Sequence, residues 1–213
     1  VKNADLVIEA VFEDMKIKRE TFAKLEARCR PDTIFCTNSS VMSPSEISAE
    51  LRHRERFVGT HFWNPGHLIP LVEVVKSEQA PQEYADIAVE LLRRCHKTAV
   101  LMKKFIRGYI VNRLQQCLNR EVFYLLDNGY CDAEAIDLAA KASFIPRACV
   151  LGLCKRMDFG GLDMTANNYK NHSYTMPEHG DDMPHVLEEH VDHGELGIKS
   201  GHGFYDYDGL DMD

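Results

Sequence analysis

The stretch "DLVIEAVF", at residues 5–12, is a nearly continuous apolar run with the length of a β-strand. A parallel strand covered by helices on both faces has this composition, whereas a strand with one face in water alternates apolar and polar residues. The run therefore predicts a central strand of a parallel sheet.

Helical patterns alternate with further strand-like runs up to about residue 102. Met15, Phe22, Leu25 and Cys29 recur at helical spacing, and Pro31 follows just beyond the last turn. Only a short loop separates the runs at residues 56–62 and 70–75, which predicts that these two strands pair. The alternation indicates an open α/β sheet with largely right-handed crossovers. Further strands are expected at residues 33–38, 56–62, 70–75 and 98–102, and further helices at 44–52 and 84–95.

The character of the sequence changes after Gly108. Apolar residues between 110 and 125 follow helical spacing up to Asn128 and Gly129, and Asp132 can cap a further helix over residues 133–143. From there on the pattern predicts helices only. The sequence thus divides into an α/β part at residues 1–107 and a helical part at residues 108–213.

Composition narrows the classes of partner. The 213 residues are 45% hydrophobic and 27% charged, which is typical of one or two folded domains. A net charge of -8 without a basic run argues against nucleic acid and anionic membranes as partners. No stretch approaches the roughly 18 apolar residues of a membrane span. The seven scattered cysteines favour reduced core thiols, so a cytoplasmic location is expected.

His61, in "THFWNP", ends one of the predicted strands. Ligands of open α/β sheets bind beyond the carboxyl ends of the strands. Taken alone, a histidine beside Phe62 and Trp63 is open to two interpretations, a packing residue or a catalytic base. Trp63, the single tryptophan, is interpreted as a wall of the site.

Glu73 interrupts "LVEVV", where an unpaired carboxylate would cost several kcal/mol, roughly. If the loop at residues 64–69 joins neighbouring strands, Glu73 can meet His61, fix its tautomer and stabilise the imidazolium. A general base held in this way contributes on the order of 10² to 10⁴ in rate. The alternative is an edge position at which Glu73 faces water.

Two further polar sites stand out. The stretch "TNSS", at residues 37–40, ends another strand at the same edge, where it can donate hydrogen bonds to a substrate oxygen, cap the next helix, or do both. Asn112 lies one turn into the first long helix after the boundary, among apolar residues. A buried amide needs partners, so Asn112 either bridges the domains or points into the cleft.

Six motifs, taken in order, resemble those of the L-3-hydroxyacyl-CoA dehydrogenase family. They are "ADLVIEAVFEDMKIK", "TNSS", "HFWNP", "LVEVV", "GYIVNR" and "GIKSGHGFYDY". The similarity spans residues 3–207 and is weakest at residues 144–194. It implies a Rossmann-type NAD-binding domain without its first βαβ half, followed by an all-α C-terminal domain that supplies a homodimer interface.

The resemblance also implies roles for single residues. His61 is similar to the catalytic histidine, which takes the proton of the 3-hydroxyl while hydride leaves carbon 3 for NAD, and Glu73 to the glutamate that orients it. Ser40 and Asn112 match residues that contact the reacting oxygen and the acyl group. The substrate implied is an L-3-hydroxyacyl-CoA of fatty acid or butanoate-type metabolism, oxidised to the 3-oxoacyl-CoA. The residues that match the cofactor side are Glu13, Lys18, Ser40, Asn64 and Lys199.

The chain departs from the family at several places. No glycine precedes Gly59, so the glycine-rich phosphate loop and the acidic ribose ligand with which the family opens do not occur here. We therefore expect an N-terminally truncated dehydrogenase without a cradle for the pyrophosphate. Residues 105–108 keep only the glycine of the family's Asp-x-Pro-Gly. The stretch "IPRACVLGLCKRMDFGGLDM" replaces "PMGPFELLD" and bears on the acyl-chain preference.

Two other functions stay open, a related dehydrogenase of a free hydroxy acid such as carnitine or a sugar acid, and a non-catalytic dimerisation fragment. A metal site is not expected, although His172, His179, His185, His190 and His193 crowd one segment. Their spacing lacks the HExxH pattern and no cysteine is near, which favours a solvated loop. The glycine-rich "GIKSGHGFYDY" follows no strand-then-helix pattern and is interpreted as a terminal turn.

Overall fold

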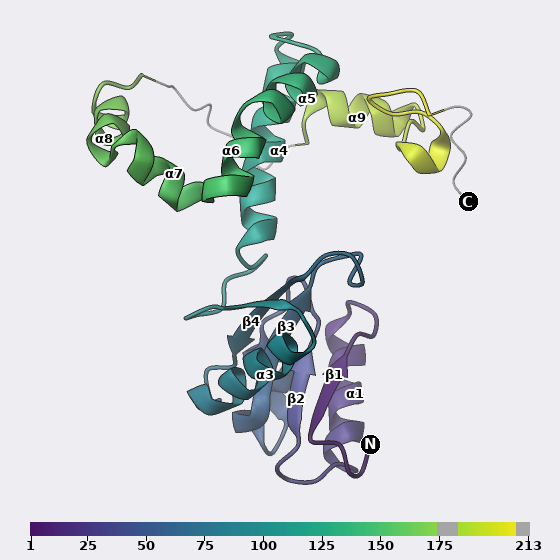
Figure 1. Cartoon of the computed structure of the whole chain (residues 1–213). Helices are drawn as coiled ribbons and strands as arrows, with labels where there is room; N and C mark the ends of the chain where they lie inside the picture. Colours follow the sequence, from purple (N-terminus) through teal and green to yellow (C-terminus); the bar gives the residue numbers. More distant parts are fainter. Residues whose placement is uncertain (174–182, 208–213) are drawn as a thin grey trace. The chain divides into compact units, whose positions relative to one another are not determined.

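The computed structural model describes residues 1–173 and 183–207. The chain divides into two compact units, residues 1–114 and 115–213 (Figure 1). This division falls inside a continuous helix, so the domain boundary expected at residues 107 and 108 stays a prediction.

The first unit is built on a five-stranded sheet with the strand order β1-β2-β3-β4-β5. β1, β2 and β3 are parallel, β4 is antiparallel to β3, and β5 is parallel to β4. The mostly parallel α/β sheet and the pairing of the third and fourth strands are therefore confirmed. The strands are β1 (Leu6–Glu9), β2 (Ile34–Thr37), β3 (Phe57–Phe62), β4 (Leu71–Lys76) and β5 (Thr98–Leu101).

The expectation that the first strand is central is wrong for this sheet. β1 is four residues long, lies at the end of the strand order and pairs with β2 alone. Leu6 and Val7 are half-buried and Ile8 is 42% exposed. An apolar run indicates that a strand is suited to burial, but it does not indicate how many strands pair with it.

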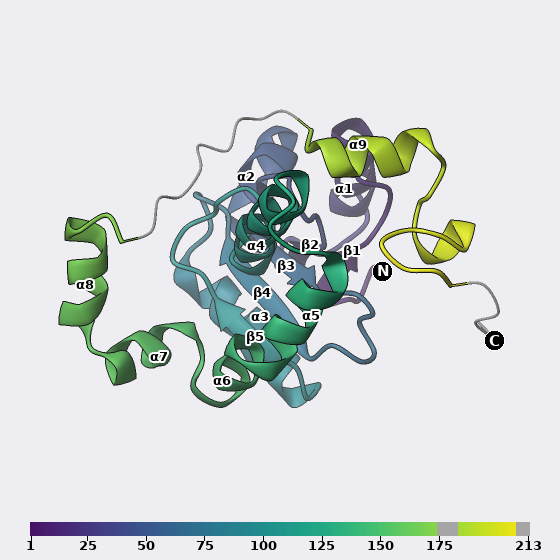
Figure 2. The same ribbon diagram turned by 90° about the horizontal axis from the view of Figure 1, so that it is seen from above.

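Helices cover both faces of the sheet. Strand residues alternate between the faces, so Cys36, Val58 and Val74 pack against α3, while Phe35 and Phe57 pack against α1 and α2. Figure 2 shows α1 and α2 on one side of the sheet and α3 on the other. The helices are α1 (Met15–Glu26), α2 (Pro44–Ile47) and α3 (Gln82–Arg94), with 3-10 turns at Ser48–Glu50 and Arg54–Arg56.

Helices follow from residue 111 onward, as predicted. Asp132 caps α5 by accepting a hydrogen bond from the Ala135 N–H at 2.8 Å, which confirms the expected cap. The terminal stretch forms a 3-10 turn at Ile198–Ser200 and two isolated bridges that meet at His202. The helices are α4 (Val111–Asp127), α5 (Ala133–Ala142), α6 (Phe144–Leu151), α7 (Leu153–Gly160), α8 (Leu162–Lys170) and α9 (His185–Asp192).

Within residues 1–173 and 183–207, no helix has the length and apolarity needed to cross a membrane. All seven cysteines are free. Burial raises the pKa of Cys36 to about 12, so this thiol stays protonated in the core. Cys95, Cys117, Cys149 and Cys154 are exposed in this chain, so the expectation of core thiols is met by Cys36 and not by these four.

Candidate active site

His61 and Glu73 face each other across the antiparallel pair of β3 and β4. His61 Nδ1 lies 2.9 Å from Glu73 Oε2, and both side chains are buried. The strand pairing and the contact expected from the sequence are both present. The alternative for Glu73, an edge position facing water, is wrong because β4 lies between β3 and β5.

The carboxylate determines which nitrogen of His61 can accept a proton. Burial alone would raise the pKa of Glu73, but hydrogen bonds from His61, Trp63, Ile110 and Val111 outweigh it and hold the pKa below the ordinary value of 4.5. An ionised carboxylate can only accept, so His61 Nδ1–H donates to it and Nε2 carries the lone pair. The pair is thus arranged as a base and its orienting carboxylate.

Trp63 is a second donor to the same carboxylate oxygen. Its indole Nε1 lies 3.1 Å from Glu73 Oε2, so the interpretation of Trp63 as only a wall is wrong. The sequence did contain a signal for this contact. Residues 61 and 63 are two positions apart and lie on the same face of an extended strand, and a buried carboxylate needs donors for its lone pairs.

The other oxygen of Glu73 accepts two backbone N–H groups. Ile110 N and Val111 N lie 2.8 and 3.1 Å from Oε1, at the start of α4. These N–H groups have no partner within the helix, so Glu73 serves as the cap of α4. The sequence holds no local sign of this contact, because the partners are 37 and 38 residues apart.

Tyr109 covers His61. Its ring is stacked on the imidazole with centroids 4.8 Å apart and planes inclined by 26°. The side chain is fully buried, and its hydroxyl has no hydrogen-bond partner among the protein atoms. Burial raises the pKa of Tyr109 above its usual range, so the hydroxyl stays protonated. The motif "GYIVNR" contains this tyrosine, but its spacing alone did not reveal the stacking.

A second network of charges joins the carboxyl ends of β1 and β2. Buried Glu9 accepts hydrogen bonds from Lys18 Nζ at 2.8 Å and from Thr37 Oγ1 at 2.9 Å. Lys18 also forms an ion pair with Glu13 at 3.2 Å, and its side chain is 1% exposed. The ammonium of Lys18 is thus held between two carboxylates, and it fixes the position of Glu13.

Glu13 in turn fixes the loop after β2. One of its oxygens accepts hydrogen bonds from the Ser39 hydroxyl, from Ser40 N at 3.0 Å and from Val41 N at 3.4 Å. Its side chain remains 38% exposed. Burial would raise the pKa of Glu13, but hydrogen bonds from Ser39 and Lys18 lower it. Glu13 is therefore an ionised carboxylate that holds Ser40 at the end of β2.

The remaining predicted residues occupy different surroundings. Asn64 is exposed in the loop after β3, and the half-buried Asn112 lies in the first turn of α4, directly after Val111. Lys199 is exposed and belongs to the second unit. There it lines a cavity of about 310 Å³ beside His190 and Phe204.

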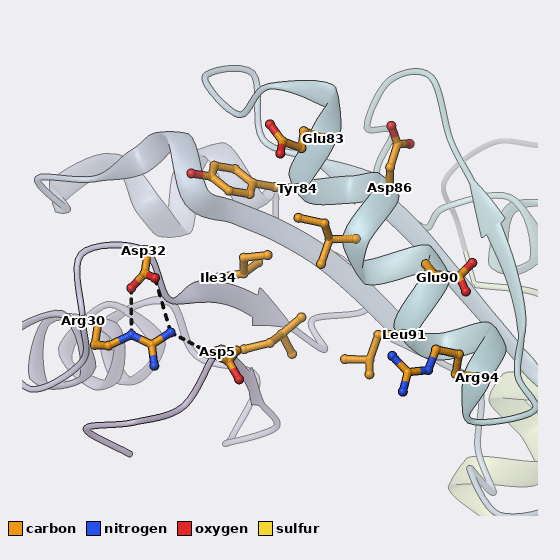
Figure 3. Close-up of a pocket in the computed structure, with 12 residues that line it drawn as sticks. Asp5, Arg30, Asp32, Ile34, Glu83, Tyr84, Asp86, Glu90, Leu91 and Arg94 are labelled. Atoms are coloured by element: carbon orange, nitrogen blue, oxygen red, sulfur yellow. Dashed lines mark hydrogen bonds and ion pairs between the residues drawn. The ribbon is translucent and has the colours of Figure 1, made fainter.

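A larger cavity, of about 720 Å³, lies where α3 passes the amino ends of β1 and β2 (Figure 3). Three of its charged groups are paired with one another, since Arg30 binds Asp5 at 2.6 Å and Asp32 at 2.9 Å. His61 stands at the carboxyl end of β3, which is parallel to β1 and β2, so this cavity is at the opposite edge of the sheet. It does not belong to the candidate active site.

The histidine-rich segment forms no metal centre in the part of the chain that the structure describes, since no three His, Cys, Asp or Glu side chains converge there. His190 is paired with Glu195 at 2.6 Å. His179 lies outside the described residues.

Comparisons with known protein families cover nearly the whole chain. Residues 1–105 match the family described as "3-hydroxyacyl-CoA dehydrogenase, NAD binding domain". Residues 108–207 match the "3-hydroxyacyl-CoA dehydrogenase, C-terminal domain". The two matches follow each other in the order that the motifs predicted.

Individual relatives agree with this match. The chain is 35% identical to a probable 3-hydroxybutyryl-CoA dehydrogenase of Bacillus subtilis, over 97% of this chain and 71% of that one. It is 33% identical to the 5-formyl-3-hydroxy-2-methylpyridine 4-carboxylate 5-dehydrogenase of Mesorhizobium japonicum, over 97% and 67%. A crystal structure of an enzyme of this second activity, named as an NAD+ dependent dismutase, gives a TM-score of 0.87 at 29% identity, over 98% and 67%. The chain thus spans about two thirds of the length of these relatives.

Proposed function

The chain belongs to the 3-hydroxyacyl-CoA dehydrogenase family, a family of NAD-dependent oxidoreductases, and from this premise we propose that it oxidises an L-3-hydroxyacyl-CoA to the 3-oxoacyl-CoA. The observation that carries the proposal is the buried His61–Glu73 pair at the carboxyl end of β3, with Nε2 left as the acceptor nitrogen. The wider setting we propose is fatty acid or butanoate-type metabolism in the cytoplasm.

His61 acts as the general base in this proposal. Nε2 takes the proton of the substrate's 3-hydroxyl, and the imidazolium that forms is stabilised by the Glu73 carboxylate at Nδ1. When bound, NAD supplies the acceptor for the hydride that leaves carbon 3. The stacked ring of Tyr109 keeps water from one face of the imidazole. In the reverse direction, the imidazolium returns the proton to the oxygen of the 3-oxo group.

Ser40 and Asn112 are proposed to orient the substrate. Ser40 stands at the end of β2 with its backbone fixed by Glu13. Asn112 follows the two residues of α4 whose N–H groups bind Glu73. Hydroxyl and amide groups can donate to the reacting oxygen or to the acyl carbonyl, which favours one approach of the 3-hydroxyl to His61.

Polar side chains of the first unit fit the nicotinamide and ribose end of NAD. Glu13 offers an ionised, partly exposed carboxylate to ribose hydroxyls, and Lys18 holds that carboxylate in place. Asn64 and Ser40 can bind the amide and the hydroxyl groups nearby. Residues 1–58 contain no glycine, so we assign the pyrophosphate to none of them. Lys199 is proposed as a cofactor contact from the second unit.

A small carboxylate without CoA is the second candidate substrate. The relative from Mesorhizobium japonicum, whose name is that of a pyridine carboxylate dehydrogenase, is as similar in sequence as the CoA-dependent relatives. The two candidate substrate classes are separated by comparing kcat/KM for acetoacetyl-CoA, measured with NADH, and for the pyridine carboxylate, measured with NAD. A ratio above about 10² in favour of either substrate would assign the class.

The test of the proposed base is His61→Gln. We expect NADH-dependent reduction of acetoacetyl-CoA to fall by about 10² to 10⁴, because glutamine cannot carry the proton. His67→Gln is the matched control, since His67 is exposed in the loop after β3. Calorimetry should show similar NADH binding by both variants. Near wild-type turnover with His61→Gln would exclude His61 as the base.

A further inference from the structure

We propose that Trp63 is a positioning residue for the His61–Glu73 pair: its indole N–H holds Glu73 Oε2 and shares that oxygen with His61. The consequence for turnover rests on the proposed dehydrogenase function, whereas the consequence for the carboxylate does not.

The geometry gives Glu73 four donors, two on each oxygen. The amides of Ile110 and Val111 bind Oε1, and the side chains of His61 and Trp63 bind Oε2. A carboxylate with donors on both oxygens cannot rotate about its Cγ–Cδ bond without breaking several hydrogen bonds. The orientation of the lone pair that meets His61 Nδ1 therefore depends on all four.

Indole is suited to this task because it donates and never accepts. The Trp63 N–H is neutral at every working pH, so it fixes the oxygen without competing for the proton that His61 takes up. The rings of His61 and Trp63 are 6.1 Å apart and inclined by 64°, so each approaches the oxygen from its own direction. A phenylalanine at this position would leave Oε2 with His61 alone.

Sharing Oε2 between two donors also makes the Glu73 carboxylate a weaker proton acceptor. Each donor draws charge from Oε2, so losing the indole would make Glu73 a stronger proton acceptor and a stronger partner for the imidazolium. The other titratable groups around His61 are Glu73 on β4 and Tyr109 before α4, with Glu13 after β1 acting on Tyr109. A Trp63 variant substitutes none of these residues, so a shift can be assigned to the loss of the indole N–H.

The chain offers a clean substitution because Trp63 is its single tryptophan. A tryptophan-auxotrophic host supplied with benzothienylalanine replaces one N–H by sulfur and alters no other residue. Trp63→Phe gives a second variant without the donor. Phe62→Leu is the control, since Phe62 is the adjacent aromatic residue and packs on the opposite face of the sheet.

The first readout is the titration of the Glu73 carboxyl carbon by NMR. We expect the pKa of Glu73 to rise by about one pH unit in both donor-free proteins and to stay unchanged in Phe62→Leu. Thermal unfolding at neutral pH is measured in parallel. A lower Tm without movement of the carboxyl titration would show that Trp63 only packs, and would overturn the proposal.

The second readout is the pH profile of acetoacetyl-CoA reduction and of its reverse reaction. Without the indole, we expect the acid limb of kcat/KM for hydroxyacyl oxidation to move to higher pH and kcat to fall about 3- to 30-fold, with KM nearly unchanged. Unmoved profiles beside a moved Glu73 titration would refute the catalytic part. A chain without turnover whose Glu73 titration still moves would refute the dehydrogenase function and support the positioning.

Discussion

Glu73 is a fully buried carboxylate, and its stability in the sheet depends on its four donors. Removing an ion from water costs several kcal/mol, roughly, unless hydrogen bonds replace the lost hydration. Here one imidazole, one indole and two backbone amides do so. The same contacts that make the site chemically competent therefore decide whether the strand can be buried at all.

The lowered pKa of Glu73 predicts a pH dependence of stability. A carboxyl group whose pKa is lowered by folding stabilises the native state above its ordinary value of 4.5, and this contribution is lost as the pH falls through the lower folded value. Glu73→Gln should lower the free energy of unfolding by about 2 kcal/mol at pH 7, because its amide N–H₂ faces other donors.

Urea unfolding between pH 7 and pH 3 measures this effect. The difference between wild type and Glu73→Gln should shrink as the pH falls from about 4.5 towards the lower folded pKa, because the unfolded chain takes up its proton before the native carboxyl does. Glu50→Gln is the control, since Glu50 is largely exposed beside Arg19 and its loss should change stability by less than about 1 kcal/mol. A constant difference at every pH would contradict the role given to the Glu73 charge.

Single residues of the site differed in how far the sequence could predict them. The contact of His61 with Glu73 could be predicted, because a charge within an apolar strand must have a partner and the loop at residues 64–69 is short. The contacts of Glu73 with Ile110 and Val111 could not, because they join distant segments through backbone groups that every residue possesses. The sequence matched Lys18 only to the cofactor side, and the fold shows that it is buried between Glu9 and Glu13.

At the scale of elements, β3 contacts both α2 and the segment before α4 at Gly59. A Cβ atom added at this glycine would lie 2.9 Å from Pro44 Cγ, 2.9 Å from the Tyr109 hydroxyl and 3.1 Å from Val75. Carbon atoms do not approach so closely without displacement. The absence of a side chain at Gly59 is thus what allows Tyr109 to reach over β3 and stack on His61.

Gly59→Ala is therefore expected to destabilise the first unit by about 1 to 3 kcal/mol. Gly66→Ala is the matched control, because the nearest atom to its added Cβ is 4.0 Å away and the free energy of unfolding should barely change. In a Tyr109→Phe background the cost of Gly59→Ala should be smaller, since one of the two closest atoms is gone. Equal costs in both backgrounds, measured by urea unfolding, would argue against a close contact at Tyr109.

Local sequence patterns predicted where the helices begin and end more closely than they predicted which strands lie side by side. The helices at α1, α3, α4 and α5 begin and end near their predicted positions, because caps, prolines and apolar spacing are local properties. The edge position of β1 could not be predicted, since strand order depends on which segments pair. The antiparallel pairing of β3 and β4 could be predicted, because the loop between them is too short for the crossover helix that parallel strands require.

At the scale of the whole molecule, the two units differ in how they are buried. The fully buried residues of the described chain all occur at or before Tyr109, and helices α4 to α9 contain none. Large apolar side chains stay exposed on these helices, among them Leu138, Val150 and Phe159. Helices that expose large apolar side chains and have no core of their own are stabilised when another surface covers those side chains. We therefore propose a homodimer formed through the helical unit, as the family resemblance implies.

We expect light scattering after gel filtration to give the mass of two chains. Val150→Asp should weaken the association at least about tenfold, because Val150 is 83% exposed on α6 and a charge there would be desolvated in an interface. Gln79→Asp adds the same charge to an exposed loop of the first unit and should leave the mass unchanged. A wild-type chain that stays monomeric at high micromolar concentration would exclude the dimer.

The cap that Glu73 provides for α4 has a thermodynamic consequence. Because the ionised carboxylate accepts from Ile110 and Val111, adding one proton to Glu73 weakens the first turn of α4 and the hold on His61 in the same event. Linkage makes this reciprocal, so a ligand that tightens the start of α4 must disfavour the protonated form of Glu73 by the same free energy. The acidity of the site and the rigidity of this helix end are therefore a single variable.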